Sequence, residues 1–358
     1  MKKIKNITFA LLFLLSPMMA SAQLYAIRDS LPNNYNFWLY VPDGYKDNRA
    51  ARAAAEKSEN DSLAKQVKRP LPIVLFLHGR SLSGTNLYLV RKYGTLDALT
   101  AGRKVNAVVI APQVKLGDWW RPQRLMEIIQ WVSKRYDVDE TRIYVLGMSL
   151  GGYGTIDFAA TYPEKTAAAM AFCGGASSRK PEALKNLNKV PLWIMHGTAD
   201  AAVPVSESRR VRDAMLQDNK DLPLLRYDEF EGAGHSIFAR TFYTNEAYEW
   251  LFKHSTADSV RVVDRTVQIP ISRIERPNAY AGLRFHSVNL KVIDPLGVGT
   301  VPKTIPTNKV VAKYHTVTSG DTLGHLAIKY KTTVRKICEL NKMKETDILK
   351  LGRKLRVQ

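Results

Sequence analysis

The chain has 358 residues, a formal net charge of +20 and 45% hydrophobic residues. This length suits one large domain followed by a small one, and the hydrophobic content excludes a disordered chain. The chain has only two cysteines, Cys173 and Cys338, which exclude a fold resting on a disulfide framework. Cys173 lies in an apolar run and is expected to be a small core residue.

The first 22 residues have the layout of a secretory signal peptide. Three lysines precede a short apolar run from Ile7 to Ala20, and Ala20-Ser21-Ala22 offers a cleavage site of small residues. We therefore expect cleavage after Ala22 and an exported protein, in the periplasm or cell envelope or outside the cell. The alternative is a membrane anchor, which the short run disfavours. We expect no transmembrane segment after cleavage.

The positive charge is concentrated towards the C-terminus. Residues 256–358 carry 19 Lys and Arg against 8 Asp and Glu. A basic tail domain suits an acidic surface such as a bacterial envelope. Nucleic acid is the other common partner of such charge, and the export signal argues against it. The remaining alternative is a solvated basic surface with no specific partner.

Short apolar runs alternate with longer helical patterns between residues 72 and 252. The apolar runs cover 72–79, 106–112, 142–147, 167–175, 191–197 and 224–230, and helical patterns cover 121–136 and 205–217. This alternation predicts βαβ units and an α/β fold, with a mostly parallel sheet covered by helices on both faces. The earlier runs 26–29 and 36–42 are expected to form an antiparallel edge.

The remaining segments complete the expected organisation. Residues 50–69 are polar and favour a helix, which indicates a surface insertion in the main domain, residues 23–255. Residues 256–313 are expected to hold a few edge strands and an extended linker. Residues 314–358 predict a compact βααβ unit, because two helix-capping positions lie between two short strand patterns.

The strongest motif is Gly147-Met148-Ser149-Leu150-Gly151, which follows a predicted strand and opens a helical pattern. This context is typical of a nucleophile elbow, a tight turn that presents a serine hydroxyl above the sheet. Side chains two residues before and after the serine would clash in such a turn, so glycine is needed there. The amides at the start of the helix favour developing negative charge near Ser149.

A serine hydroxyl needs a histidine to take its proton and a carboxylate to orient that histidine. Asp200 follows the predicted strand 191–197, and His235 follows the predicted strand 224–230. Open α/β sheets build their sites at these strand ends. We therefore predict Ser149, Asp200 and His235 as a catalytic triad, against the alternatives of a helix-capping aspartate and a loop histidine.

The residues around this triad suggest further roles. The oxyanion hole needs two backbone amides, for which we expect Leu150 and the turn after His78-Gly79, at Arg80 or Ser81. The Arg80 side chain either meets an acidic substrate group or points to solvent. Trp119 and Trp120 follow another predicted strand, and either hold an aromatic or sugar group or pack beneath the loop. His78 and His196 are expected to be structural.

The segments FLHG, RIYVLGMSLGGYGT, HGTADAAVPV and GAGHSIF resemble an α/β-hydrolase branch that contains polyhydroxybutyrate depolymerases, feruloyl esterases and predicted peptidases. The resemblance covers residues 24–254, including all three predicted triad positions. It implies the α/β-hydrolase fold and an ester-cleaving enzyme that works through an acyl-enzyme, without metal or cofactor. It does not fix the substrate.

Residues 314–358 resemble a LysM domain over their whole length, with matching residues from His315-Thr316-Val317 to Gly352. LysM domains bind glycans that contain N-acetylglucosamine, such as peptidoglycan. The resemblance places the glycan groove at two loops, whose residues here are Gly320, Asp321, Thr322, Leu323, Asp347, Ile348 and Leu349. Arg353 stands where the family commonly has glutamine. A module that keeps the fold and has lost its ligand is the alternative.

Together these patterns predict an exported serine esterase tethered to a glycan, with an acyl ester as substrate. A serine peptidase of the prolyl-oligopeptidase type is a second hypothesis, although no propeller or gating domain precedes residue 72. A third hypothesis is a non-catalytic peptidoglycan-binding envelope protein.

Overall fold

The computed structural model divides the chain into two compact units, Met1–Leu296 and Gly297–Gln358. In the first unit it describes residues 21–57, 69–178, 181–218, 224–270 and 290–294, and in the second 314–318, 321–323, 326–327, 330, 332, 334–343, 347 and 352–357. Most of the predicted signal peptide and parts of the segments 50–69 and 256–313 lie outside these residues. Within them, no helix has the length and apolarity to cross a membrane.

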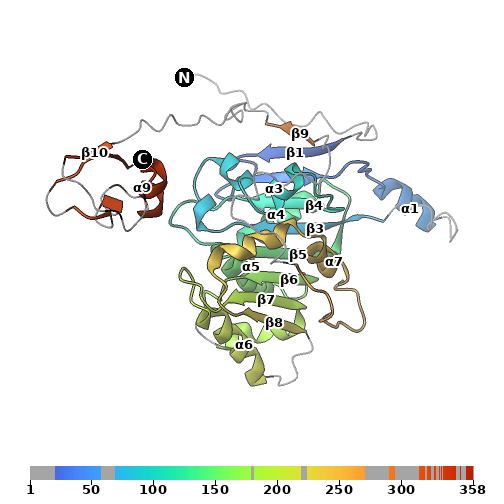
Figure 1. Cartoon of the computed structure of the whole chain (residues 1–358). Coiled ribbons are helices and arrows are strands. Elements are labelled where there is room, and N and C mark those ends of the chain that lie inside the picture. The colour runs from blue at the N-terminus through green and yellow to red at the C-terminus, as the bar shows by residue number, and fades with distance from the viewer. Residues whose placement is uncertain are drawn as a thin grey trace, which may run out of the picture. The chain divides into compact units, whose positions relative to one another are not determined.

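The first unit is built on a nine-stranded sheet in the order β8-β7-β6-β5-β3-β4-β2-β1-β9 (Figure 1). Strands β3 to β8 are parallel, and β2 runs antiparallel to both β4 and β1. The predicted parallel sheet with an antiparallel edge is therefore confirmed. The strands are β1 (Ala22–Ile27), β2 (Phe37–Val41), β3 (Leu71–Leu77), β4 (Val108–Pro112), β5 (Val138–Met148), β6 (Ala168–Phe172), β7 (Leu192–Gly197), β8 (Leu225–Phe230) and β9 (Leu290–Ile293).

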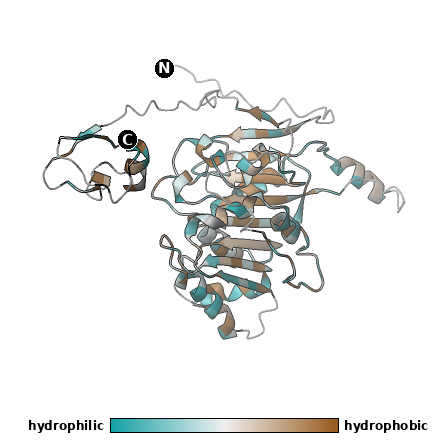
Figure 2. Ribbon diagram, viewed as in Figure 1, coloured by the Kyte–Doolittle hydropathy of each residue, from teal (hydrophilic) through white to brown (hydrophobic). Residues whose placement is uncertain are grey.

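Helices cover both faces of this sheet because the central strands are apolar on both sides. In β3, Ile73 and Leu75 join the core on one face, and Val74 and Phe76 join the core on the other. Figure 2 shows this hydrophobic character along the central strands. The first face packs against α4 (Pro122–Ser133), α5 (Leu150–Thr161), the 3₁₀ segment η3 (Pro181–Lys189) and α6 (Ser206–Asp218). The second packs against η2 (Leu87–Arg91), α3 (Thr95–Thr100), η4 (His235–Tyr243) and α7 (Asn245–Phe252).

The segment that follows α7 stays attached to the sheet. The Arg261 guanidinium donates hydrogen bonds of 2.8 and 2.6 Å to the carbonyls of Thr166 and Ala167, at the start of β6. Further on, β9 pairs in parallel with β1, and Ala22 lies opposite Leu290. The described part of residues 256–313 thus contributes one edge strand. Ala22 itself, the last residue of the predicted signal peptide, begins β1.

The remaining helix of the first unit, α1 (Arg49–Lys57), lies in the predicted insertion. The Arg52 guanidinium donates a 2.7 Å hydrogen bond to the buried carboxylate of Asp137, just before β5. This ion pair attaches the described part of the insertion to the sheet.

The second unit has a two-stranded antiparallel sheet of β10 (Tyr314–Thr316) and β11 (Lys354–Arg356), with α9 (Val334–Asn341) between them in the chain. Backbone bonds from Leu326 to Thr322 and from Tyr330 to Leu326 give a helical stretch before α9. The predicted βααβ order is confirmed. A small core of Val317, Leu323, Leu326, Ala327, Ile337, Cys338, Leu355 and Val357 holds the unit together.

Candidate active site

Ser149 sits at a tight turn between β5 and α5, with φ 59° and ψ −123°. A Cβ atom on Gly147 would lie 2.4 Å from the carbonyl oxygen of Gly151, and one on Gly151 would lie 1.9 Å from that of Leu77. The two glycines are therefore needed, as the motif predicts. A left-handed conformation costs a non-glycine residue about 1–3 kcal/mol, so the surrounding structure must hold it in place. The Ser149 amide does so by donating a 2.8 Å bond to the Phe172 carbonyl.

Asp200 follows β7 with a fully buried side chain that receives hydrogen bonds at both oxygens. Its Oδ1 accepts the amides of Ala202 and Val203, each at 2.9 Å. Burial alone would raise the pKa of this carboxyl, but the Val203 amide, His235 and the Ala202 amide outweigh it, so the pKa is lowered. Asp200 is therefore held ionised.

His235 begins η4, and its Nδ1 lies 2.6 Å from Oδ2 of Asp200. The loops that carry these two residues are joined by backbone bonds from Thr198 to Phe230, at 3.0 Å, and from Ala199 to Ala233, at 3.1 Å. A Cβ on Gly197 would lie 2.0 Å from the Ala233 carbonyl oxygen, so glycine permits this close approach. The structure thus brings together an acid and a base that are 35 residues apart in the chain.

Ser149 reaches the same edge of the sheet through the end of β6. Phe172 accepts the Ser149 amide, and the Sγ of the next residue, Cys173, lies 3.8 Å from the His235 carbonyl oxygen. No hydrogen bond joins the Ser149 hydroxyl to the His235 ring among the described residues. In free enzymes this bond is often long and tightens when substrate binds.

The two amides predicted for the oxyanion hole both lie at helix starts, where N–H groups have no partner within the helix. Leu150 begins α5, and Arg80 begins the 3₁₀ turn η1 (Arg80–Leu82). A Cβ on Gly79 would lie 3.4 Å from Cβ of Ser149, so this turn packs directly against the serine. Ser81 remains the alternative to Arg80.

Tyr93 fixes the same turn, a role that was not predicted. Its hydroxyl accepts the Gly79 amide at 3.2 Å and lies 3.2 Å from Oγ of Ser81. Burial raises the pKa of Tyr93, so the phenol stays protonated. A tyrosine distant in the chain from a turn carries no sequence pattern that links the two.

The two tryptophans of GDWWRP face different surroundings. Trp119 is 41% exposed, and its ring centroid lies 5.8 Å from that of Tyr153 and 6.0 Å from Cζ of Arg80. Trp120 is 4% exposed, and a Cβ on Gly154 would lie 2.6 Å from its ring. The prediction that Trp120 binds substrate is therefore corrected: it packs beneath the loop, because α5 offers it a glycine-lined space.

Leu116 was not predicted and is 76% exposed in the same loop as Trp119. An exposed leucine beside a 41% exposed tryptophan gives this loop an apolar surface at the carboxyl edge of the sheet. A lone leucine in a polar segment carries no signal that could have identified it from the sequence.

His78, which ends the strand run before η1, has a structural role. Its Nδ1 lies 2.7 Å from the Gly79 carbonyl, and its Nε2 accepts the Val114 amide at 3.3 Å. Burial lowers the pKa of His78 to about 4, so the ring is neutral. It joins the turn at Gly79 to the loop after β4.

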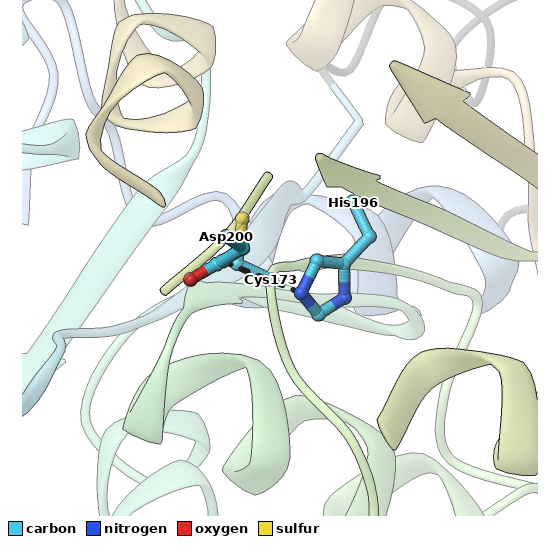
Figure 3. Close-up of side chains that lie close together, drawn as sticks. All are labelled: Cys173, His196 and Asp200. Carbon is cyan, nitrogen blue, oxygen red and sulfur yellow. Dashed lines mark ion pairs between the residues drawn. The ribbon is translucent and has the colours of Figure 1, made fainter. Parts of the chain in front are cut away.

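Cys173, His196 and Asp200 form a buried cluster whose donor atoms lie within 4.8 Å of one another (Figure 3). Such a set has the chemistry of a metal site. However, Nε2 of His196 faces two acceptors, the Val203 carbonyl at 2.9 Å and Oδ2 of Asp200 at 3.3 Å, so it carries a proton. Oδ2 also receives His235, and burial raises the pKa of the Cys173 thiol. The cluster is therefore arranged as a hydrogen-bonded network around the carboxylate.

In the second unit, the Asp321 carboxylate is used internally. Its Oδ2 accepts the amide and hydroxyl of Thr318, at 2.7 and 2.8 Å, and lies 2.7 Å from Nε2 of His315. The Leu323 side chain is 8% exposed and belongs to the small core. The predicted glycan contact is therefore corrected for the Leu323 side chain, which packs in the core, whereas Asp321 shapes the loop and its predicted glycan contact stays a prediction.

Two other predicted glycan contacts, Thr322 and Asp347, lie among the described residues. Both residues are exposed. Gly320, Ile348 and Leu349 lie outside the residues that the structure describes.

Comparison with known proteins agrees with this architecture. Residues 119–256 match the model of the dienelactone hydrolase family, and residues 315–358 match that of the LysM domain. Among curated proteins, no match was found.

Similar solved structures include three esterases. A thermostable esterase is 25% identical over 66% of this chain and 64% of its own, with a TM-score of 0.49. A ferulic acid esterase is 13% identical over 65% and 97%, with a TM-score of 0.43. An acetyl xylan esterase from Aspergillus awamori is 17% identical over 60% and 94%, with a TM-score of 0.43. The chain thus spans 64% of the length of the thermostable esterase.

The parallel sheet and the strained serine turn after β5 agree with the two matches: residues 119–256 are similar to the dienelactone hydrolase family, and residues 315–358 are similar to the LysM domain.

Proposed function

We propose that the protein is an exported serine esterase that removes acyl groups from polysaccharide and is held near its substrate by the LysM domain. The observation that carries the catalytic part is the 2.6 Å contact between His235 and Asp200, beside a serine held at φ 59°. Such a base and acid are what a serine hydroxyl needs to become a nucleophile.

In the proposed reaction, Oγ of Ser149 attacks the ester carbonyl while Nε2 of His235 takes the hydroxyl proton. The amides of Leu150 and Arg80 stabilise the oxyanion of the tetrahedral intermediate. The intermediate collapses, His235 gives its proton to the leaving alcohol, and an acyl-enzyme remains. Water then attacks this ester by the same route and releases the acid. Asp200 holds the imidazole in its Nδ1–H tautomer throughout.

The substrate part of the proposal is supported by two features. Trp119 is 41% exposed at the rim and lies in T-shaped contact with Tyr153, so it offers a flat apolar surface to an aromatic acyl group or a sugar ring. The LysM domain suggests a glycan that contains N-acetylglucosamine as the tether. Acetyl or feruloyl esters on envelope or dietary polysaccharide fit both features.

The catalytic part is tested with a fluorophosphonate probe and a panel of p-nitrophenyl esters and acylated sugars. Wild type and the control Ser255→Ala, a partly buried serine bonded to Thr141 away from the predicted triad, should react and turn over esters. Ser149→Ala should do neither. Turnover of aminoacyl nitroanilides in preference to esters would favour a peptidase, and an unlabelled wild type would leave only a binding protein.

The location and tether are tested separately. Intact mass of protein recovered from an exporting bacterial host should show Gln23 as the first residue. The full chain should sediment with insoluble peptidoglycan, and oligomers of N-acetylglucosamine should release it while cellulose fragments should not. Binding that ignores the oligomers but falls with added salt would point to charge alone.

A further inference from the structure

Asp200 is contacted by a second histidine that the proposed mechanism does not use. His196 lies near the end of β7, and its side chain is fully buried. Its Nε2 lies 3.3 Å from Oδ2 of Asp200, the oxygen that also receives His235. Figure 3 shows the His196 ring pointing this nitrogen at the carboxylate.

The proton on His196 can be assigned from its surroundings. Nε2 lies 2.9 Å from the Val203 carbonyl as well as 3.3 Å from the carboxylate, and both are acceptors. Burial lowers the pKa of His196, which favours the neutral ring. The ring is therefore the neutral Nε2–H tautomer, whose N–H donates to the Val203 carbonyl and lies beside the carboxylate, 3.3 Å from Oδ2 of Asp200.

This N–H connects β7 to the acid through Val203 and by its own position beside the carboxylate. The Val203 amide donates to Oδ1 of Asp200 at 2.9 Å, and the Val203 carbonyl accepts from His196. The acid lies on a loop, whereas His196 lies on a strand that is paired on both sides, with β6 and β8. The strand thus holds both the carboxylate and the turn that follows it.

We infer that His196 is a positioning residue for ester hydrolysis, which fixes the orientation of Asp200 and shares its negative charge with His235. This rests on the proposed catalytic roles of Ser149, Asp200 and His235. A carboxylate that loses this donor turns more easily away from His235. Where it stays in place, its Oδ2 faces His235 alone and stabilises the imidazolium more strongly, while Oδ1 keeps the amides of Ala202 and Val203.

Three titratable groups face Asp200 in the described structure: His235 from η4, His196 from β7 and Cys173 from the end of β6. Burial raises the pKa of the Cys173 thiol, which therefore stays neutral in the working range. A change in the acid limb of the pH–rate profile on altering His196 must then arise through the Asp200–His235 pair.

The test compares His196→Leu, which removes the donor, with His196→Gln, whose terminal amide reaches about as far as Nε2. His254→Leu is the matched control. His254 is 4% exposed and contacts the carbonyls of Trp250, at 2.9 Å, and Val262, at 3.1 Å, without touching Asp200. Rates are divided by the concentration of sites that a fluorophosphonate labels.

His196→Leu should lower kcat about 10- to 100-fold, the usual effect of losing an outer partner of a catalytic group, and leave KM nearly unchanged. The acid limb of kcat/KM should move to higher pH. His196→Gln should restore most of both. His254→Leu should lower the melting temperature and leave kcat and the acid limb as in wild type. His196→Asn, too short to reach Val203, replaces the leucine variant should that variant not fold.

Wild-type kcat and an unmoved acid limb in His196→Leu or His196→Asn would overturn the inference, as would a glutamine variant no better than leucine. These outcomes are distinct from failure of the proposed function. Turnover that survives Ser149→Ala refutes the serine mechanism, whereas normal turnover of the His196 variants in an enzyme that Ser149→Ala inactivates refutes the positioning role alone.

Discussion

Gly151→Ala is predicted to destabilise the hydrolase domain and weaken labelling of Ser149. The added Cβ would lie 1.9 Å from the Leu77 carbonyl oxygen and 2.9 Å from that of His78. Both atoms belong to backbone at the end of β3, a strand paired on both sides, so neither can move aside as a side chain would.

Two effects of this substitution oppose each other. Alanine is favoured over glycine within a helix by about 1 kcal/mol. Inserting a methyl group into a packed site costs about 1–3 kcal/mol, and contact with rigid backbone belongs at the upper end. The steric clash therefore outweighs the helix preference, and the free energy of unfolding should fall by about 2 kcal/mol. For a domain of this size this corresponds to a fall in melting temperature of about 4–8 °C.

The control is Gly234→Ala, beside His235. A Cβ there would meet nothing closer than the Ala199 carbonyl oxygen at 4.0 Å, and φ is −91°, which any residue accepts. Thermal unfolding and the rate of fluorophosphonate labelling should be altered in Gly151→Ala and close to wild type in Gly234→Ala. A Gly151→Ala protein that melts within 1 °C of wild type and labels at the same rate would refute the steric reasoning.

Three further outcomes are expected. Asp200→Asn should lower kcat about 10⁴-fold, because an amide leaves the histidine in the wrong tautomer, and stopped-flow or discontinuous ester assays measure this. Trp119→Ala should lower kcat/KM for aromatic esters about 2- to 10-fold, from the loss of an aromatic contact, and change acetyl esters less; equal losses would contradict the rim role. Burial lowers the pKa of His78 from 6.5 to about 4 in the folded protein. As the pH falls, the His78 side chain therefore binds a proton in the unfolded chain before it does so in the folded protein. The free energy of unfolding should therefore fall as the pH drops from 6.5 towards 4, by about 2 kcal/mol at pH 5, and His78→Asn should flatten that fall in denaturant titrations.

The sheet and the three predicted catalytic residues could be found from the sequence because each rests on a local pattern. Buried parallel strands appear in the sequence as continuous apolar runs. Ser149, Asp200 and His235 each follow such a run within a few residues. The strand ends of a parallel sheet share one edge. Residues far apart in the chain are therefore brought together by the fold class alone.

Other features depend on long-range contacts that leave no local pattern. Strand β9 pairs with β1 across 268 residues, from Ala22 to Leu290, and its sequence resembles the linker around it. Tyr93 reaches the oxyanion turn from a segment with no motif. Trp119 and Trp120 are neighbours of the same type, and Trp120 is the buried one because its ring packs against Gly154 of α5 and against Tyr35 and His78, which are distant in the chain.

A histidine followed by a glycine occurs at two turns of the site. His78-Gly79 directly follows β3, and His196-Gly197 ends β7. In each pair a Cβ on the glycine would come too close to its surroundings, 2.9 Å from the Tyr93 hydroxyl at position 79 and 2.0 Å from the Ala233 carbonyl oxygen at position 197. In each the buried histidine bonds to a loop, at Val114 or Val203. Both histidines were predicted to be structural. Their positions explain that role, because one turn carries the amide predicted for the oxyanion hole and the other carries the predicted acid, Asp200. A buried neutral histidine fixes a loop without adding charge next to the catalytic groups, which a lysine or arginine in the same place would do.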